Sequence, residues 1–358
     1  MSLTLLAVGD VCPRYSPDGR NLEAVRDLLR SGDITFGQLE EPLSNRGDRQ
    51  LYAGLGGPEW DGPPFNPDEG AGLLLDHGFD VMSFAGNHTM DRSMESMFDT
   101  LDAARKAGVS RIGAGADIDA AREPAIVERA GTRVGFLGYA SVLPGGYAAG
   151  PGKPGVAPLR ATTFYQQVDW QPGTAPKILT FPEQADLAAL ASDIRALRPE
   201  VDVLIVSVHW GVHFEPATIA DYQYAYAHAA IDAGADAILG HHAHILKGVE
   251  VYRGRPVIYS LNNFLLRPRG DDGEWLSPAN TPSDQQKSIM ARFTLDRGRI
   301  TRFAIQPIWL DHRPRPVAPA ADDPRAVAVM DYLRWCNRQQ GIGTPITLRD
   351  GEFVVDLG

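Results

Sequence analysis

The sequence predicts an α/β protein whose largely parallel sheet has both faces covered. Short apolar runs of strand length alternate with segments of helical periodicity along the first half of the chain. Several of these runs end in a residue able to bind a metal or move a proton. The chain of 358 residues is 44% hydrophobic, which is ample for one large core or two smaller ones.

The amino-terminal half supplies the first strands and helices. Apolar runs predict strands at 3–8, 34–36 and 79–84. Helical spacing predicts helices at 21–29, 69–77 and 94–107, and Gly108 closes the last one. A pair of strands is expected at 124–128 and 133–139. Residues 44–70 are rich in Gly, Pro and Asp, which favours a long surface loop.

The remainder of the chain predicts more strands than helices. Helices are expected at 187–197, 222–233 and 324–338, and strands at 201–208, 235–239, 249–252, 256–261, 288–295, 302–307 and within 342–358. Residues 143–183 interrupt the order as an insertion, and we favour a substrate lid slightly over a purely structural insertion. Tyr165 and Trp170 could cover a substrate, but ordinary core packing is the safer expectation for both rings. We therefore divide the chain into a domain at 1–316, carrying this insertion, and an extension at 317–358 packed on it.

Composition excludes several classes of partner. The net charge of −11 argues against binding to nucleic acid or to anionic membranes, because both bind positively charged protein surfaces. Two distant cysteines, Cys12 and Cys336, do not make a disulfide scaffold. The amino terminus lacks a basic leader, and no apolar run is long enough to cross a bilayer. We expect a cytoplasmic protein with a small-molecule or peptide substrate, and the oligomeric state stays open.

Three histidines within four residues point to a metal. His241, His242 and His244 follow the apolar run at 235–239, and imidazole is the commonest metal ligand. In an extended backbone His242 and His244 would face one point while His241 turns away. A merely polar surface loop is the alternative, and we favour the metal.

Five apolar runs end in chemically capable groups. These are Asp10, Glu40, Asn87 with His88, His209, and His242 with His244. Because ligands bind at the carboxyl ends of strands in open α/β sheets, these side chains are expected to meet in one pocket. A mixed nitrogen and oxygen set suits Mn, Fe, Zn or Ni better than Ca or Mg. A bridging carboxylate could hold two ions about 3.5–4 Å apart, and hydroxide generated there would be a nucleophile.

The order of motifs resembles that of a known family. The motifs are Gly9-Asp10, Gln38-Leu39-Glu40, Gly86-Asn87-His88-Thr89-Met90-Asp91, Ile112-Gly113-Ala114-Gly115, His209-Trp210-Gly211, Gly240-His241-His242-Ala243-His244 and Tyr259-Ser260-Leu261-Asn262-Asn263-Phe264. From Leu3 to Pro316 the chain resembles the CapA family of poly-γ-glutamate synthesis, within the calcineurin-like metallophosphoesterase superfamily. The resemblance implies a four-layer α/β/β/α sandwich with its site at the carboxyl ends of the strands.

The resemblance also implies roles for individual residues. It assigns Asp10 and His244 to one metal, Asn87, His209 and His242 to a second, and Glu40 to the bridging position. His88 resembles the superfamily's catalytic histidine, and Asp91 its orienting partner. His213 and His241 are expected behind the ligands or at the surface.

Four positions depart from the pattern of the resemblance. Cys12 stands where many metallophosphoesterases have histidine, and Glu40 where the superfamily has aspartate. Gln38 and Asn262 replace the usual asparagine and glycine. These changes leave open whether one or two ions bind, and whether the inherited ligands act as acids and bases without metal.

Three functions follow from these residues. The first is metal-dependent hydrolysis of a phosphoester or an amide, assisted by His88. The second is an isomerase, such as a peptide Cα epimerase, with Asp10, Cys12, His88 and His209 as acids and bases. The third is a non-catalytic accessory in poly-γ-glutamate assembly. An anionic substrate is expected to contact residues beside the motifs, namely Arg14, Arg92, Trp210, Lys247, Asn263 and Arg267.

Overall fold

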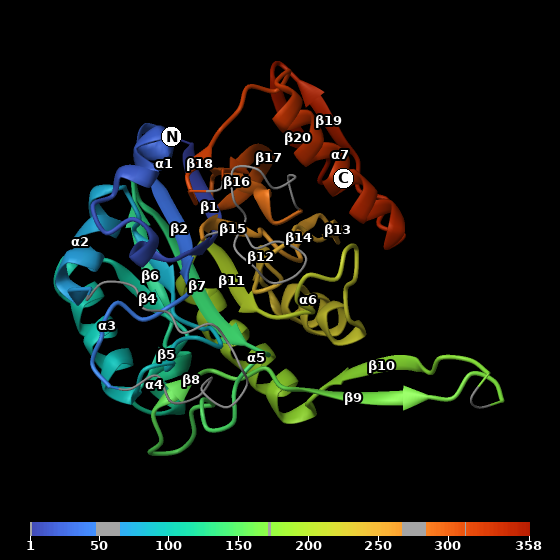
Figure 1. Cartoon of the computed structure of the whole chain (residues 1–358), viewed down its shortest axis with the longest axis horizontal. Coiled ribbons are helices and arrows are strands. Elements are labelled where there is room, and N and C mark those ends of the chain that lie inside the picture. Colours follow the sequence, from blue (N-terminus) through green and yellow to red (C-terminus); the bar gives the residue numbers. More distant parts are fainter. Residues whose placement is uncertain (1, 48–64, 171–172, 267–283, 312) are drawn as a thin grey trace.

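Two β-sheets face each other at the centre of the molecule, and helices cover their outer faces (Figure 1). The computed structural model describes residues 2–47, 65–170, 173–266, 284–311 and 313–358. Most of the loop expected at 44–70 lies outside the described residues, as does Arg267.

The first sheet joins a parallel part to an antiparallel part. Its order is β19-β20-β17-β16-β1-β2-β3-β4, with β15 beside β1 and β18 beside β17. The parallel strands are β1 (Leu3–Val11), β2 (Ile34–Leu39), β3 (Val81–Ser83), β4 (Ser110–Ile112) and β15 (Asn263–Leu265). The antiparallel part holds β16 (Lys287–Asp296), β17 (Arg299–Leu310), β18 (Pro316–Val317), β19 (Ile346–Arg349) and β20 (Glu352–Val355).

The second sheet has a parallel centre and antiparallel edges. Its order is β13-β14-β12-β11-β7-β6. The parallel centre comprises β7 (Thr132–Ala140), β11 (Val203–His209), β12 (Ala237–His241) and β14 (Arg255–Ile258). The edges are β6 (Ala125–Arg129) and β13 (Val249–Tyr252). Both sheets are therefore mixed, which corrects the expectation of one largely parallel sheet.

Three apolar layers hold the sheets and helices together. Between the sheets, Phe36 of β2 stacks on Phe136 of β7 with ring centroids 5.8 Å apart. Outside the first sheet, Leu6 packs with buried residues of α1 (Arg26–Arg30), α2 (Pro67–Asp76) and α3 (Met94–Ala107). Outside the second, Val206 packs with α5 (Gln184–Leu197) and α6 (Asp221–Ala233). The predicted four-layer α/β/β/α sandwich is confirmed.

The carboxyl-terminal extension is built into the same sandwich. Strands β19 and β20 continue the first sheet, and α7 (Pro324–Gln339) closes one end of the space between the sheets. Val329, Met330 and Leu333 of α7 belong to the core between the sheets. Among the described helices, none is both long and apolar enough to span a membrane.

Two expected elements differ from the structure. β1 continues to Val11, so Asp10 lies in the strand and not in a turn, and its register with β2 shifts between Ala7 and Asp10. The helix expected at 21–29 is a 3₁₀ helix at Arg20–Val25 followed by the short α1. Its apolar residues are still buried, because both helix types place residues three apart on one side.

The insertion at 143–183 divides into a packed part and a projecting part. Up to residue 160 it packs on the body, where β8 (Gly155–Val156) pairs with β5 (Ala114–Gly115) beside α4 (Ile118–Arg122). After residue 160, β9 (Ala161–Gln166) and β10 (Lys177–Pro182) form a hairpin that we call the arm. Figure 1 shows the arm projecting away from the sheets, not folded over them.

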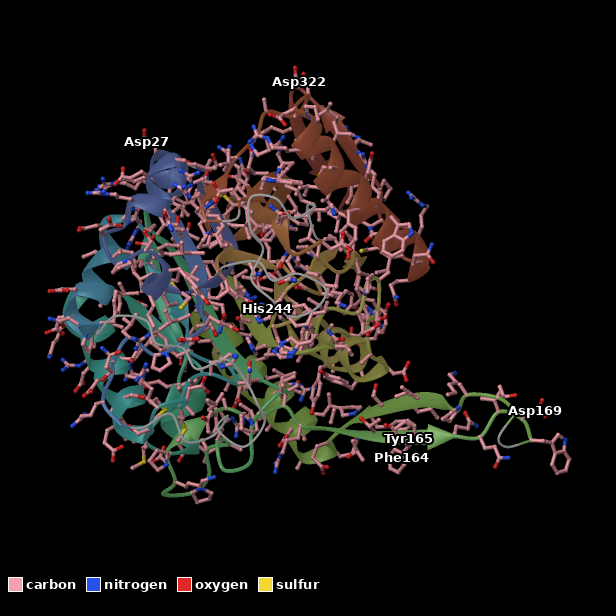
Figure 2. The ribbon with its side chains drawn as sticks, viewed as in Figure 1. Asp27, Phe164, Tyr165, Asp169, His244 and Asp322 are labelled. Carbon is pink, nitrogen blue, oxygen red and sulfur yellow. The ribbon has the colours of Figure 1, made fainter. Side chains whose placement is uncertain are left out.

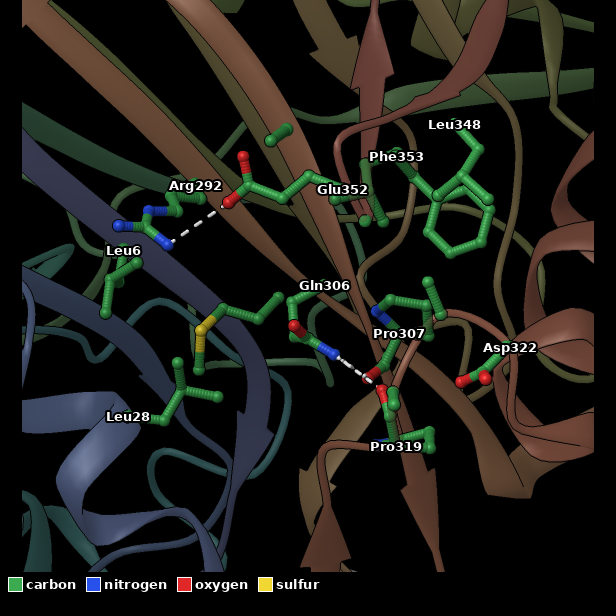
Figure 3. A pocket seen from close by; sticks show the side chains of 16 residues that line it. Leu6, Leu28, Arg292, Gln306, Pro307, Pro319, Asp322, Leu348, Glu352 and Phe353 are labelled. Carbon is green, nitrogen blue, oxygen red and sulfur yellow. Dashed lines mark hydrogen bonds and ion pairs between the residues drawn. The ribbon is translucent and has the colours of Figure 1, made fainter.

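A cavity of about 410 Å³ lies on the outer side of the first sheet. Figure 3 shows it between Leu28 of α1 and Leu348 and Phe353 of the extension, with Arg292 and Glu352 paired at 3.4 Å along one wall. Its lining includes none of the candidate site residues. The chemistry predicted for this chain therefore lies elsewhere.

Candidate metal centre

The ends of parallel strands from both sheets bring the predicted ligands together. Asp10 lies near the end of β1, Glu40 follows β2, and His209 is the last residue of β11. One oxygen or nitrogen of each of these three side chains lies within 4.8 Å of the others, and all three residues are buried. Figure 2 labels His244 in the middle of the molecule, where the loop after β12 adds its histidines.

Close backbone contact positions Asp10. A Cβ added to Gly9 would lie 1.7 Å from the Asn262 carbonyl oxygen, so only glycine permits this approach. The Asp10 N–H donates to that oxygen at 3.0 Å. The next residue, Asn263, begins β15, and its Oδ1 lies 2.7 Å from His244 Nδ1. Asn263 therefore orients His244.

The histidine loop holds Asp10 and Glu40 from the opposite sheet. His241 Nδ1 donates to Asp10 Oδ1 at 3.0 Å, and the His242 N–H donates to Asp10 Oδ2 at 3.3 Å. His244 lies between the carboxylates, with Nδ1 3.4 Å from Asp10 and Nε2 3.2 Å from Glu40.

The loop is not extended. This corrects the expectation that an extended backbone makes His242 and His244 face one point. β12 ends at His241, and His242 and His244 have φ of 86° and 52°. Positive φ in non-glycine residues costs on the order of 1–3 kcal/mol and persists only where surrounding structure enforces it. His241 reaches Asp10 from the end of β12, and the turned backbone after it lets His242 and His244 face the site as well.

Asn87, His209 and His242 form a second group beside the first. His209 Nε2 lies 2.6 Å from Asn87 Oδ1 and 3.1 Å from His242 Nδ1. The exposed His213 ring stacks on His242 with centroids 3.8 Å apart. The structure thus brings all six predicted metal ligands into one continuous cluster.

His88 lies at the edge of this cluster with a carboxylate on either side. Its Nδ1 donates to Asp91 Oδ2 at 2.6 Å, and its Nε2 lies 3.8 Å from Glu40 Oε1. Burial lowers the pKa of His88, but Asp91 and Glu40 outweigh it and raise that pKa to about 9. Tyr147 of the insertion donates to Asp91 Oδ1 at 3.4 Å. Sequence reasoning missed Tyr147, and a tyrosine in a glycine-rich insertion gave no signal for it.

Burial and neighbouring charge set the protonation of the ligands. Burial favours neutral Asp10, but contacts with His241 and His244 hold the pKa of Asp10 well below its usual range. Burial lowers the pKa of His244 as well, yet Glu40 and Asp10 raise it to about 10. Burial lowers the pKa of His209 to about 4, and burial together with the neighbouring histidines lowers the pKa of His242 well below its ordinary value. His209 and His242 are therefore neutral, the form that binds metal.

The residues present fit a divalent cation. Glu40 is 2% exposed, and its carboxylate is faced by the imidazoles of His244 at 3.2 Å and His88 at 3.8 Å. A buried carboxylate is costly unless a cation compensates it, and a metal ion would take this place where His244 binds as a neutral ligand. Burial and Asp10 raise the pKa of Glu40, whereas His244 and His209 lower it overall, so it is ionised. Two carboxylates with neutral imidazoles and an amide oxygen suit Mn, Zn or Fe.

Several predicted substrate contacts face away from the cluster. Arg14 is buried and donates to the carbonyl oxygens of Pro42 and Ser44, which fixes the loop after β2. The fully buried Trp210 donates from Nε1 to the Tyr259 carbonyl oxygen at 3.0 Å.

Lys247 and Cys12 are also held inside the protein. Lys247 is 1% exposed and donates to the Glu215 carbonyl oxygen, and burial lowers its pKa to about 8. The Cys12 thiol is buried, which raises its pKa well above the ordinary value. Arg92 is partly buried next to Asp91. Among the described substrate-contact candidates, Asn263 contacts the cluster through His244, and Arg92 follows Asp91 in the chain.

The two facing sheets, their covering helices and the buried Asp10, Glu40 and His209 cluster define an α/β/β/α protein with a candidate metal centre. The family described as bacterial capsule synthesis protein PGA_cap matches residues 4–267, and the chain belongs to this family. The expected CapA membership is confirmed.

Relatives and solved structures extend this comparison. The chain is 27% identical to the PGA biosynthesis protein CapA of Bacillus subtilis over 82% of this chain and 66% of that protein. It is 34% identical to a probable polyglutamine synthesis accessory protein of Mycobacterium tuberculosis over 50% of this chain and 43% of that protein. It therefore spans about two thirds or less of these two relatives.

Among solved structures, the NAD nucleotidase of Haemophilus influenzae aligns at 11% identity with a TM-score of 0.43, over 95% of this chain and 60% of that one. A purple acid phosphatase from yellow lupin seeds aligns at 10% identity with a TM-score of 0.35, over 86% of this chain and 52% of that one. Likenesses of this size concern the fold alone.

Proposed function

We propose that the protein is a metal-dependent hydrolase that cleaves a phosphoester or an amide in a small or peptidic anionic substrate. The observation that supports it best is the cluster of Asp10, Glu40 and His209, three buried side chains whose ligand atoms lie within 4.8 Å of one another. Burying two carboxylates this closely is unfavourable without a cation. A site that keeps them together is organised to bind one.

The chain's own residues divide into a binding group and a proton-handling group. Asp10, Glu40, Asn87, His209, His242 and His244 would hold one or two divalent ions, with Asn263 orienting His244. A bound ion supplies Lewis acidity that polarises the scissile group and activates water. His88 has its Nδ1 tied to Asp91, which leaves Nε2 to give a proton to the leaving group.

The epimerase stays an alternative to the hydrolase. An epimerase needs an acid and a base that both reach the substrate Cα. The full burial of Cys12 disfavours it as one of these groups, which leaves Asp10, His88 and His209 as the candidates.

The accessory role in poly-γ-glutamate assembly stays as the second candidate, because the family is described by capsule synthesis and a relative is named for PGA biosynthesis. In that case the cluster would bind metal for structure, or none at all. The hydrolase and the accessory differ in whether the metal-loaded protein turns over a simple ester.

Elemental analysis of protein purified without added metal, then incubated with Mn or Zn and desalted, tests the proposal. The native chain is expected to retain one or two ions, and His242→Ala to lose most of them. His228→Ala is the matched control, because His228 pairs with Glu250 away from the cluster. A native chain that binds no more metal than His242→Ala contradicts the proposal.

Hydrolysis of a chromogenic phosphodiester by the loaded protein then separates the candidates. The hydrolase predicts turnover that disappears in His88→Ala while metal content stays near the native level. Metal retention without turnover of phosphodiester, phosphomonoester or anilide probes favours the accessory role.

A further inference from the structure

The arm exposes large apolar side chains that nothing in the described protein covers. Exposure is 54% at Phe164, 72% at Tyr165, 58% at Ile178 and 49% at Phe181. Near the tip, Val168 is 61% exposed and Trp170 is 88% exposed. Figure 2 shows Phe164 and Tyr165 on the projecting hairpin, far from the labelled His244. Contiguous exposed apolar patches of this kind mark interaction sites.

The pairing of the two strands concentrates these side chains on defined faces. Phe164 lies opposite Leu179, and Tyr165 lies opposite Ile178. Phe164 and Phe181 meet edge to face with ring centroids 5.7 Å apart. One face of the hairpin thus carries the Phe164, Leu179 and Phe181 cluster, and the other carries Tyr165 and Ile178. A two-stranded hairpin of this size is marginally stable alone, so a partner sheet would stabilise it.

The two outer edges of the hairpin differ in protection. Edge strands are usually guarded by charged residues or proline. β10 carries both, Lys177 and Pro182, whereas β9 has the sequence Ala-Thr-Thr-Phe-Tyr-Gln with neither. β9 pairs only with β10 within the described residues. The β9 edge is therefore open to another strand.

Charge favours a second copy of this chain as the occupant. Residues 161–182 contain only Asp169 and Lys177 as charged groups, so the arm is neutral on a chain of net charge −11. A contact at the arm keeps two acidic bodies apart. Aromatic side chains offer about 150–250 Å² each. A sheet joined through β9 covers only the rings beside the joined edge, so we expect a contact smaller than the roughly 800 Å² per partner of a standard interface, and accordingly a weak dimer.

The geometry points to a symmetric dimer in which β9 of one copy pairs antiparallel with β9 of a second copy. A twofold axis through the centre of β9 makes the surface self-complementary and gives a continuous sheet in the order β10-β9-β9-β10. The Phe164, Leu179 and Phe181 clusters of the two copies then adjoin on one face. This dimer forms independently of the metal centre, because no cluster residue lies on the arm.

Sedimentation velocity of the full-length chain between about 1 and 100 μM tests the dimer, since interfaces of this size often bind in the micromolar range. The native chain is expected to dimerise, and Phe164→Lys to dimerise at least tenfold more weakly. Val327→Lys is the matched control, because Val327 of α7 is 44% exposed off the arm. Phe164 is exposed, so the thermal unfolding midpoint should stay near that of the native chain. A native chain that stays monomeric, or a dimer that Phe164→Lys leaves unchanged, overturns the proposal.

A cysteine scan along Ala161–Gln166 tests the pairing itself. The native Cys12 and Cys336 are buried and do not compete. Opposed residues of an antiparallel pair lie within disulfide reach only near the twofold axis. Oxidative cross-linking should therefore peak at one or two adjacent positions. Uniformly low cross-linking overturns the pairing, as does a native monomer that instead floats with lipid vesicles or binds an extended peptide.

Discussion

The metal centre and the arm depart in opposite ways from the usual burial of side chains: the first buries polar groups and the second exposes apolar ones. At the metal centre, carboxylates and imidazoles are buried between two sheets. On the arm, aromatic rings stand in water. Most polar groups are exposed and most large apolar groups are buried, so each region is unfavourable as it stands. On the proposals above, the centre binds a cation and the arm binds an apolar surface.

Substituting the same residue type in two environments has the largest expected effect. Phe136 is fully buried between the sheets and stacks on Phe36, whereas Phe164 is 54% exposed. Phe136→Ala should lower the free energy of unfolding by about 3–5 kcal/mol, because it removes buried area and leaves a cavity. Phe164→Ala should change it by less than about 0.5 kcal/mol. Denaturant unfolding at 1 μM, where the arm is free, measures both.

Equal decreases in the free energy of unfolding for Phe136→Ala and Phe164→Ala would contradict this difference between the two regions. They would show that the arm packs against the body in solution. The slope of the denaturant transition provides the control. A steeper or shallower slope in either variant would mean that the denatured state has changed as well.

Metal removal has the next largest expected effect. A ligand present at a hundred times its dissociation constant stabilises the folded state by about 2.7 kcal/mol. Adding Mn or Zn to the native chain should therefore raise its unfolding midpoint, and a chelator should reverse the rise. Glu40→Gln should abolish the response, because the amide removes the buried charge that a cation compensates. Glu41→Gln is the matched control on the neighbouring, less buried side chain, and it should respond like the native chain.

The sequence predicts the architecture well where periodicity and capping agree. The helix at 94–107 is found with those bounds, because Ser93 and Ser96 cap its start and Gly108 ends it with φ of 85°. The alternation of Leu5 and Leu6 likewise places one side chain between the sheets and the other under the helices. Periodicity does not encode strand direction. The sequence therefore predicts strands in the regions of β16, β17, β19 and β20, but not that they run antiparallel in the first sheet.

Part of the site could not be predicted, because it depends on where strands end. Alternation along β12 places His241, like Leu239, between the sheets, where it reaches Asp10. The strand stops there, and the left-handed backbone of His242 and His244 turns these two side chains to the site as well. Single basic residues near the motifs predict substrate contacts poorly. Arg14 and Lys247 bind backbone carbonyl oxygens inside the protein, a use that looks no different in sequence from contact with a substrate.

Lys247 gives a pH-dependent test of the buried polar region. Burial lowers its pKa from 10.5 to about 8, so between these values the unfolded chain binds more protons than the folded one. As pH rises from about 8 to 10.5, the Lys247 contribution therefore increases the free energy of unfolding by on the order of 2 kcal/mol. Lys247→Met should lack this gain, which appears as the difference between the native and variant pH profiles. Parallel profiles would mean that the amine is solvated.

Tyr147 tests where the two regions meet, because the insertion that carries the arm also contacts the site. Its hydroxyl donates to Asp91, which in turn holds His88. Tyr147→Phe keeps the ring and removes one hydrogen bond of 3.4 Å, so we expect a loss of about 0.5–1.5 kcal/mol in the free energy of unfolding. Metal content and dimerisation should be unchanged, because the hydrogen bond that is removed goes to Asp91, which is neither a predicted ligand nor part of β9. A variant that lost metal would show that the insertion supports the ligands themselves, and one that lost dimerisation would show that the arm is positioned through the site.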